Sequence, residues 1–312
     1  MIKNILRKMK HCIQDIGTKG YVLMLHRVSE IDSNGIFMNE NMKVSPKFLE
    51  NFILKYKEKY DFISSTEIND RLKNKSKKKF IVFTMDDGYL DNYENAFPIF
   101  KKYNVPFTIF VASDFPNMKC FLWWHILGDM ILQKDYLRLS DGSTYSCARL
   151  ETKNLVFEQL RSKILILNQD DLMTEFCSLF GIDLPELQIF NAKYCMSWEN
   201  IFELYKNSLV TIGAHTAHHA NLRAMETEND VEEEIIEGVK ELEKHIPDYK
   251  KSVFAYPFGS PFEIGKREIA IAEKIGFVSA FLGYGRGVKS KNNHWAIPRI
   301  ALTENFDFSI LK

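Results

Sequence analysis

Short apolar runs that end in reactive polar side chains constrain the fold of this chain more than any other feature. The clearest run covers residues 80–83 (Phe-Ile-Val-Phe), whose β-propensity and flanking polar residues predict a buried strand. Asp86 and Asp87 follow this strand almost directly. Two adjacent carboxylates repel each other unless a cation or a proton resolves the repulsion, although Asp-Asp-Gly is also an ordinary turn sequence. The pair therefore marks either a charged site or a simple turn at the exit of a strand.

A cluster of histidines follows a second apolar run. Residues 209–214 precede His215, His218 and His219, and three histidines after a strand favour a metal site over packing. His215 and His219 are four residues apart, so one helical turn or a tight loop would aim both imidazoles at one point. His218 is an alternative ligand that the spacing does not exclude. Two imidazoles and one carboxylate suit zinc, with iron, cobalt or nickel as alternatives.

Two further apolar runs end in the same way. Residues 251–255 lead into Tyr256-Pro257-Phe258-Gly259, and residues 21–25 lead into His26-Arg27. Parallel α/β barrels build their active sites at the C-terminal ends of the strands, because the loops that follow converge there. The remaining chain alternates strand and helix as such a fold requires. We expect helices at residues 45–60, 90–103, 228–246 and 263–275, and further strands at 107–111 and 277–282.

Three of these strand ends resemble the motifs of the polysaccharide deacetylases, the NodB-homology or carbohydrate esterase family 4 group. The family's Thr-Phe-Asp-Asp-Gly is similar to Thr84-Met85-Asp86-Asp87-Gly88, and its His-Ser/Thr-x-x-His to His215-Thr216-Ala217-His218-His219. Its third motif, Arg-x-x-Pro-Tyr-Gly, is present only in part, as Ala255-Tyr256-Pro257-Phe258-Gly259. The resemblance covers residues 20–115 and 196–302. It implies an α/β fold, a distorted (β/α) barrel of about seven units with a helical insertion.

The resemblance also implies roles for the motif residues. Asp87, His215 and His219 would hold a divalent metal, most simply Zn²⁺, and Asp86 would act as the general base. Phe258 would contribute its backbone N–H to the oxyanion and, together with Tyr256, would contact the substrate.

Two departures from the family pattern require substitutes. The chain lacks the C-terminal Leu-x-His motif, and residues 25–28 (Leu-His-Arg-Val) resemble the circularly permuted branch, so His26 is assigned as the general acid. A strand-end histidine that caps the barrel is the alternative. The arginine that usually pairs with the base is replaced by Ala255, and Arg299 is the best substitute. Its alternative is a surface arginine after a proline.

The predicted domain organisation has three parts. Residues 1–19 are expected to form an amphipathic helix, either on a membrane surface or against the closed end of the barrel. Residues 20–312 form the barrel domain, which is interrupted at about 116–196 by a helical insertion. Within the insertion, Trp123 and Trp124 suggest a glycan platform over the site, with core packing as the alternative, and Trp124 is included among the substrate-binding residues. His125 shows no evident link to the metal cluster.

The amino-acid composition limits which partners the protein is expected to bind and where in the cell it is expected to act. Lys plus Arg equals Asp plus Glu at 41 each, so no overall field attracts nucleic acid. The five cysteines are odd in number and widely spaced, which is typical of reduced thiols in a cytoplasmic protein. The N-terminal residues lack the uninterrupted apolar core of a signal peptide. We therefore expect a cytoplasmic protein, with the inner membrane surface as a second location, and the oligomeric state stays open.

These inferences predict a metal-dependent hydrolase that removes an N-acetyl group from an amino sugar. The substrate would be a polysaccharide, a lipid-linked glycan or a nucleotide sugar. A sugar deformylase with the same mechanism is the first alternative. The others are a non-catalytic glycan-binding protein with a vestigial site and a structural scaffold. The filled ligand and base positions favour an enzyme.

Overall fold

The computed structural model describes residues 16–74, 76–165, 167 and 171–311. Most of the expected N-terminal helix over residues 1–19 lies outside the described residues. Its described end differs from the expectation, because strand β1 (Thr18–Leu25) already begins at Thr18. None of the helices that the structure describes is both long enough and apolar enough to cross a bilayer.

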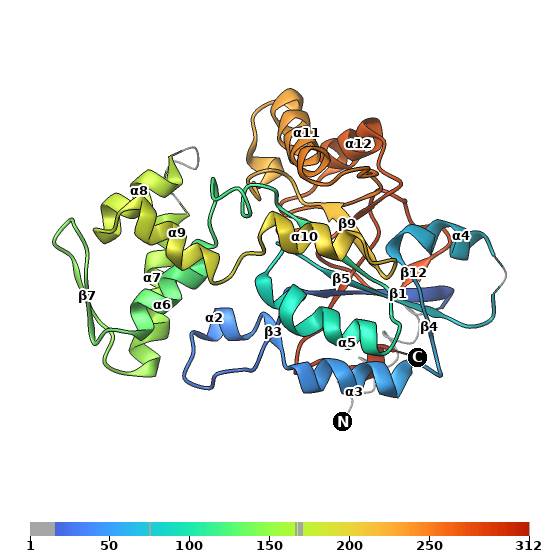
Figure 1. Cartoon of the computed structure of the whole chain (residues 1–312), viewed down its shortest axis with the longest axis horizontal. Helices are drawn as coiled ribbons and strands as arrows, with labels where there is room; N and C mark the ends of the chain where they lie inside the picture. Colours follow the sequence, from blue (N-terminus) through green and yellow to red (C-terminus); the bar gives the residue numbers. More distant parts are fainter. Residues whose placement is uncertain (1–15, 75, 166, 168–170, 312) are drawn as a thin grey trace.

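A curled sheet forms the centre of the molecule (Figure 1). Its strands run in the order β11 (Ser279–Phe281), β10 (Val253–Ala255), β9 (Val210–Ala214), β6 (Phe107–Val111), β5 (Phe80–Met85), β1 and β12 (Val288–Lys289). Two short strands, β13 (Ile300–Ala301) and β4 (Asp61–Phe62), pair with β1 and β5. These pairings are parallel except for β1 with β12, so the C-terminal ends of the main strands face the same way.

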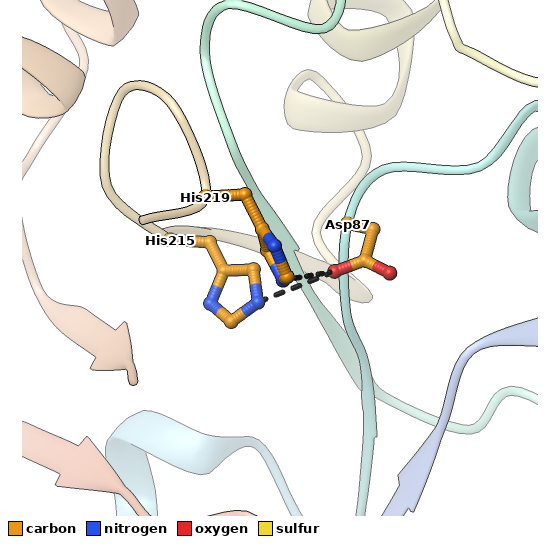
Figure 2. Close-up of side chains that lie close together, drawn as sticks. All are labelled: Asp87, His215 and His219. Carbon is orange, nitrogen blue, oxygen red and sulfur yellow. Dashed lines mark ion pairs between the residues drawn. The ribbon is translucent and has the colours of Figure 1, made fainter. Parts of the chain in front are cut away.

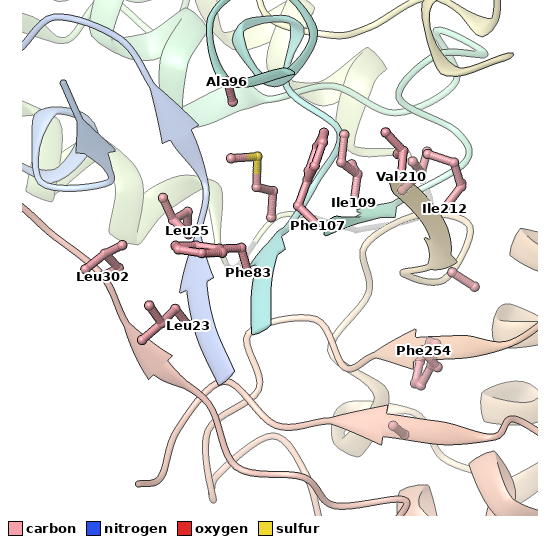
Figure 3. Packing of buried hydrophobic residues seen from close by; sticks show 14 of the residues in the cluster. Leu23, Leu25, Phe83, Ala96, Phe107, Ile109, Val210, Ile212, Phe254 and Leu302 are labelled. Atoms are coloured by element: carbon pink, nitrogen blue, oxygen red, sulfur yellow. The ribbon is translucent and has the colours of Figure 1, made fainter. Parts of the chain in front are cut away.

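Alternate residues of each strand face opposite sides of the sheet, as the two-residue period of a strand requires. One set packs under the outer helices: Leu23, Phe83, Ile109, Ile212 and Phe254 belong to this large cluster (Figure 3). The other set, which includes Val22, Val82, Phe110, Val253 and Phe281, forms a separate cluster inside the curl. Residues that continue this inner set past the strand ends, such as His26 after β1 and Asp86 after β5, therefore reach the inner mouth of the barrel.

The last segment of the chain brings the two sides of the sheet together. Ile297 bridges Phe281 in parallel, and the strand β13 that follows pairs with β1. Ile297 also packs in the inner cluster. The expected distorted barrel is thus confirmed, with a seam at residues 297–301.

Helices cover the outside of the sheet (Figure 1). The short helix α4 (Ile68–Lys73) is an exception, because its Ile68 and Leu72 belong to the inner cluster. The covering helices are α3 (Pro46–Tyr56), α5 (Phe97–Lys102), α10 (Trp198–Tyr205), α11 (Glu228–His245) and α12 (Lys266–Ile275). Their starts follow from local sequence: the Ser45 side chain accepts from the Phe48 N–H before Pro46, and Thr227 caps α11 with a capping box. The helix expected at 90–103 is split, because a π-helical segment (Asn92–Ala96) precedes α5.

The insertion forms a lobe beside the barrel (Figure 1). It contains α6 (Trp123–Leu132), α7 (Leu150–Ile164), α8 (Leu172–Phe180), α9 (Leu184–Ala192) and an antiparallel hairpin of β7 (Tyr136–Arg138) and β8 (Thr144–Ser146). The hairpin is not anticipated by the apolar pattern. The lobe has a hydrophobic cluster of its own, built on residues such as Phe157, Leu160 and Phe176.

Smaller elements join these layers. The strands β2 (Arg27–Val28) and β3 (Lys43–Val44) pair in parallel beside the barrel mouth, with the short helix α2 (Phe37–Glu40) between them. Three 3₁₀ turns lie at Ser65–Glu67, Leu222–Ala224 and Phe308–Ile310.

Candidate active site

Asp87 faces the imidazoles of two histidines at the C-terminal mouth of the barrel (Figure 2). His215 Nε2 is 3.3 Å and His219 Nε2 is 3.2 Å from the same oxygen, Asp87 Oδ1. Burial of this carboxyl opposes its charge, but the two histidines hold its pKa well below the usual range. The three side chains offer ligand atoms within 4.8 Å of one another. The structure thus gathers the three residues that the sequence assigns as metal ligands.

The donor atoms at this point fit a metal ion. Asp87 Oδ1 is buried and receives no hydrogen bond from any described residue, although two imidazole nitrogens lie beside it. His215 Nδ1 is 2.7 Å from the Ala255 carbonyl, which can only accept, so the proton is on Nδ1 and the Nε2 lone pair is free to coordinate. An orphaned carboxylate oxygen and converging lone pairs are what a cation would satisfy.

Asp86 is bound by Arg299 through two parallel hydrogen bonds. Arg299 Nη1 and Nη2 each lie 2.6 Å from one carboxylate oxygen, and the guanidinium is 1% exposed. Burial opposes the charge on Asp86, but Arg299 and then His215 lower its pKa below the usual value. The alternative of Arg299 as a surface residue is wrong. A carboxylate that stays ionised in a dry setting is suited to accept a proton.

His26 follows β1 at the same mouth. It continues the inner face of that strand, two residues beyond Met24, and is half-buried. Its imidazole is near enough to lower the pKa of both Asp86 and Asp87. The Asn92 side chain donates to its backbone carbonyl at 2.8 Å, which fixes the strand end. The assigned acid therefore lies at the same strand-end mouth as the assigned base and ligand.

The histidines are carried by a strained loop rather than by a helical turn. Thr216 and His219 have positive φ angles of 66° and 58°, and Asp87 has one of 72°. Such angles are costly for residues with a side chain and persist when packing enforces them. Here α11 presses on the loop: a Cβ at Gly238 would lie 2.5 Å from the Thr216 carbonyl.

Comparison with known proteins agrees with this geometry. The sequence model of the family described as polysaccharide deacetylase matches residues 73–142 and 161–280, more than half of the chain. The chain belongs to the polysaccharide deacetylase family. A curated protein of Bacillus subtilis (strain 168), YxkH, named for the same family, is 49% identical over 39 residues. That match spans 12% of this chain and 14% of the relative.

Solved deacetylase structures share the fold of this chain. The Streptococcus pyogenes deacetylase PplD in complex with acetate has a TM-score of 0.62 at 17% identity, covering 93% of this chain and 94% of that one. IcaB from Ammonifex degensii has a TM-score of 0.57 at 18% identity, with the same two coverages. A de-N-acetylase from Aggregatibacter actinomycetemcomitans has a TM-score of 0.58 at 17% identity, covering 93% and 97%.

Tyr256 and Phe258, both assigned to substrate binding from the third motif, differ in exposure: one is buried and the other is exposed. The Tyr256 side chain is buried among core residues, its ring 4.9 Å from that of Phe254, and its hydroxyl donates to the Trp295 carbonyl. The expectation that Tyr256 contacts substrate is therefore not met. Phe258 is 54% exposed, and its ring centroid lies 4.8 Å from that of His219. Its φ of 59° belongs to the tight turn that Gly259 completes.

The insertion reaches the site through Trp124. The indole centroid is 5.9 Å from the His219 ring, and Nε1 donates to the Tyr89 hydroxyl at 3.1 Å. His125 Nε2 lies 3.3 Å from that hydroxyl, so His125 is linked to the site, contrary to the sequence-based expectation. Tyr89 also pairs with Cys195 in an antiparallel bridge, which joins the end of the insertion to the Asp-Asp-Gly loop.

His218 points away from the first metal group. Its Nδ1 lies 2.7 Å from Glu234 Oε2 and its Nε2 lies 3.0 Å from Asp114 Oδ2. Asp114 and Glu234 raise the pKa of His218 to about 10. The structure thus separates His218 from His215 and His219, a distinction that spacing leaves open. The sequence does not single out either acid, since Asp114 lies alone in the loop after β6 and Glu234 is one of three consecutive glutamates on α11.

Proposed function

We propose that this polysaccharide deacetylase is a metal-dependent carbohydrate N-deacetylase. The observation that carries the proposal is the buried pair of Asp86 and Arg299 directly beside the group of Asp87, His215 and His219. One carboxylate is held ionised by a guanidinium, and its neighbour lies beside two imidazoles with one oxygen buried and unbonded among the described residues. These are the requirements of a general base next to a cation site.

A bound divalent cation, with zinc the first choice, would act as a Lewis acid toward the amide carbonyl and lower the pKa of water in the site. Asp86 accepts a proton from the attacking water, and Arg299 keeps the carboxylate oriented through its two hydrogen bonds. His26 donates a proton to the departing amine, because an amide anion is too poor a leaving group. After turnover Asp86 releases the proton that it took from water and His26 takes one up, and the half-buried position of His26 permits this exchange with solvent.

Side chains around the site support a sugar substrate. Phe258 presents an exposed ring next to His219, and Trp124 also lies next to His219 with its indole fixed by Tyr89. Aromatic faces of this kind suit the apolar faces of sugar rings and would limit the size of the acyl group. We propose an N-acetylated amino sugar in a polysaccharide, a lipid-linked glycan or a nucleotide sugar. The described cysteines Cys120, Cys147, Cys177 and Cys195 are unpaired, which favours the expected cytoplasmic location.

The proposal is tested by acetate release combined with metal analysis. The purified chain, loaded with zinc, is incubated with N-acetylglucosamine oligomers and with a nucleotide-linked N-acetyl sugar, and acetate is measured. Acetate release that is lost in Asp87→Asn together with bound metal supports the proposal. A formamido sugar in parallel separates deformylation from deacetylation. Bound metal with no acyl release from any of these sugars would overturn the proposal, and metal-free glycan binding would favour the non-catalytic alternative.

A further inference from the structure

Asp114, His218 and Glu237 form a second group of potential metal ligands, separate from Asp87, His215 and His219. Asp114 follows β6, His218 belongs to the loop after β9, and Glu237 is on α11. Each offers one ligand atom, and these atoms all lie within 4.8 Å of one another. The group combines two carboxylates and one imidazole from three different elements, and none of the proposed catalytic steps uses it.

The imidazole of His218 is oriented as metal-binding histidines are. Glu234 accepts twice from this residue, from the backbone N–H and at Nδ1, both at 2.7 Å. A carboxylate on one ring nitrogen fixes the ring and increases the basicity of the other nitrogen. The other nitrogen, Nε2, faces Asp114 Oδ2. Glu234 is 6% exposed and sits on α11 one turn before Glu237, so it supports the group from within the protein.

Asp114 contributes an independent observation. The residue is 0% exposed, and its Oδ1 accepts from the Asn117 side chain at 3.0 Å. Its Oδ2 is buried and receives no hydrogen bond from the part of the chain that the structure describes, even though His218 Nε2 lies 3.0 Å away. Asp87 Oδ1 shows the same combination with His215 and His219 at 3.2–3.3 Å. In both places a buried carboxylate oxygen and an imidazole nitrogen converge at 3.0–3.3 Å.

The negative charge of the surrounding carboxylates also favours a bound cation. Three carboxylates, those of Asp114, Glu234 and Glu237, lie around His218, so the group stays negative even with a protonated imidazole. Lys119 approaches Asp114 only at 4.0 Å with a largely exposed side chain. Two ligand atoms 90° apart at about 2.1 Å from an ion are separated by about 3.0 Å, which matches the distance between His218 Nε2 and Asp114 Oδ2. Mixed nitrogen and oxygen donors suit first-row divalent ions such as Zn²⁺, Mn²⁺ or Co²⁺.

We propose that Asp114, His218 and Glu237 form a second divalent-cation site, supported by Glu234. His218 and His219 are adjacent, so one short loop supplies ligands to both sites, on opposite sides of its backbone. Glu237 is exposed, so the second site opens to solvent on α11. A cation there ties the loop to α11 and to the β6 exit, and thereby holds the strained Thr216–His219 backbone that presents His219. The inference stands independently of the acyl substrate.

The test is a Zn²⁺ titration of the metal-free full chain by calorimetry, with elemental analysis of the dialysed product. The wild type is expected to bind two equivalents. Glu237→Gln and Asp114→Asn should each bind one, and Asp87→Asn should lose the other one. Glu237 is exposed, so its variant is expected to fold even if Asp114→Asn does not. Glu233→Gln is the matched control, because Glu233 is an exposed acid one turn earlier on the same helix; it should bind two.

Each contrary result has a definite meaning. One equivalent in the wild type, lost in Asp87→Asn and kept in Glu237→Gln, overturns the second site and leaves His218 as the protonated partner of two carboxylates. Two equivalents in both Glu237→Gln and Asp114→Asn also overturn it, since the second ion must then bind elsewhere. Acetate release is measured separately. Failure of the proposed function would appear as missing acetate with two equivalents bound, and failure of this inference as acetate release with one.

Discussion

Asp86 and Asp87 are neighbours that share the same burial and have different partners. Both are 3% exposed, but Asp86 meets a guanidinium, whereas Asp87 meets two imidazoles. The positive φ of Asp87 turns its side chain away from the direction that Asp86 takes along the inner face of β5. Two identical side chains thus have different environments, which suit the proposed base and the proposed metal ligand respectively.

The division of roles predicts the effect of removing only the base. Asp86→Asn keeps the shape of the side chain and one oxygen for Arg299, but it cannot accept a proton. We expect kcat/KM for acetate release to fall by about 10²–10⁴-fold, the range for loss of a general base. Metal content, measured by elemental analysis, should stay at the wild-type level. Loss of metal from this variant, or retention of full activity, would contradict the assignment.

The proposed acid is tested by changing the leaving group. His26→Gln should lower kcat for an N-acetyl sugar by about 10²–10⁴-fold, because the amine must leave protonated. Hydrolysis of p-nitrophenyl acetate should change less than about tenfold, since p-nitrophenolate leaves without a proton. His245→Gln provides the control, because His245 stacks on Trp198 at the far end of α11. Equal losses on both substrates would show that His26 has a structural role instead.

At the scale of elements, α11 sets the conformation of the histidine loop. The helix approaches so closely at Gly238 that only a residue without Cβ fits against Thr216 and Ala217. The Glu234 carbonyl accepts from the Ala217 N–H, and its carboxylate accepts from His218. The geometry of the ligands therefore depends on a helix that contributes no side chain to the first site.

Gly238→Ala tests this dependence. In a free helix the change would add about 1 kcal/mol of stability. Here the new methyl would lie 2.5 Å from backbone atoms that cannot rotate away, so we expect a net loss of about 1–3 kcal/mol in the free energy of unfolding. Zinc affinity should fall by about tenfold or more, because His219 shifts. Lys240→Ala, an exposed change two residues on, should leave both quantities near wild type; a zinc affinity unchanged in Gly238→Ala would contradict the role of α11.

The sequence predicts the elements better than it predicts side-chain direction. Apolar runs locate β5, β6 and β9 to within one or two residues, because a buried parallel strand is a local signal. Tyr256 shows where the sequence-based prediction fails. It lies two residues after Phe254, so its side chain faces the outer helices with Phe254, whereas the motif resemblance predicts that it faces the substrate. His125 and Tyr89 meet only through the fold, since the insertion returns to the Asp-Asp-Gly loop at Cys195.

For the whole molecule, Arg299 joins the two sides of the barrel. Its Nε donates to the Leu282 carbonyl after β11, and its Nη1 reaches Thr84 on β5 as well as Asp86. Arg299 itself precedes β13, which pairs with β1. One buried side chain therefore links the first and last parts of the sheet at the seam, so the residue that holds the proposed base also closes the barrel.

This double role predicts the stability of seam variants. Arg299→Met removes the partner of a buried carboxylate, which costs about 3–5 kcal/mol and lowers Tm by roughly 5–8 °C for a chain of this size. The double variant Asp86→Asn/Arg299→Met should recover part of that loss, because no buried charge is left without a partner. Thermal unfolding of the metal-free proteins measures both. A double variant less stable than Arg299→Met would show that the carbonyl and threonine contacts, not the charge pair, hold the seam.

The ion pair of Asp86 and Arg299 also predicts how the stability of the protein changes with pH. The folded pKa of Asp86 is lowered, so its contribution to stability is complete above its unfolded pKa of about 3.9 and is lost as pH falls through the lower folded value. In Arg299→Met, burial acts without the guanidinium and raises that pKa, so the unpaired carboxylate costs stability at neutral pH and this cost disappears on protonation. The difference in Tm between wild type and variant should therefore be largest near pH 7 and narrow below about pH 4. A constant difference across this range would mean that Arg299 stabilises the barrel through its neutral contacts alone.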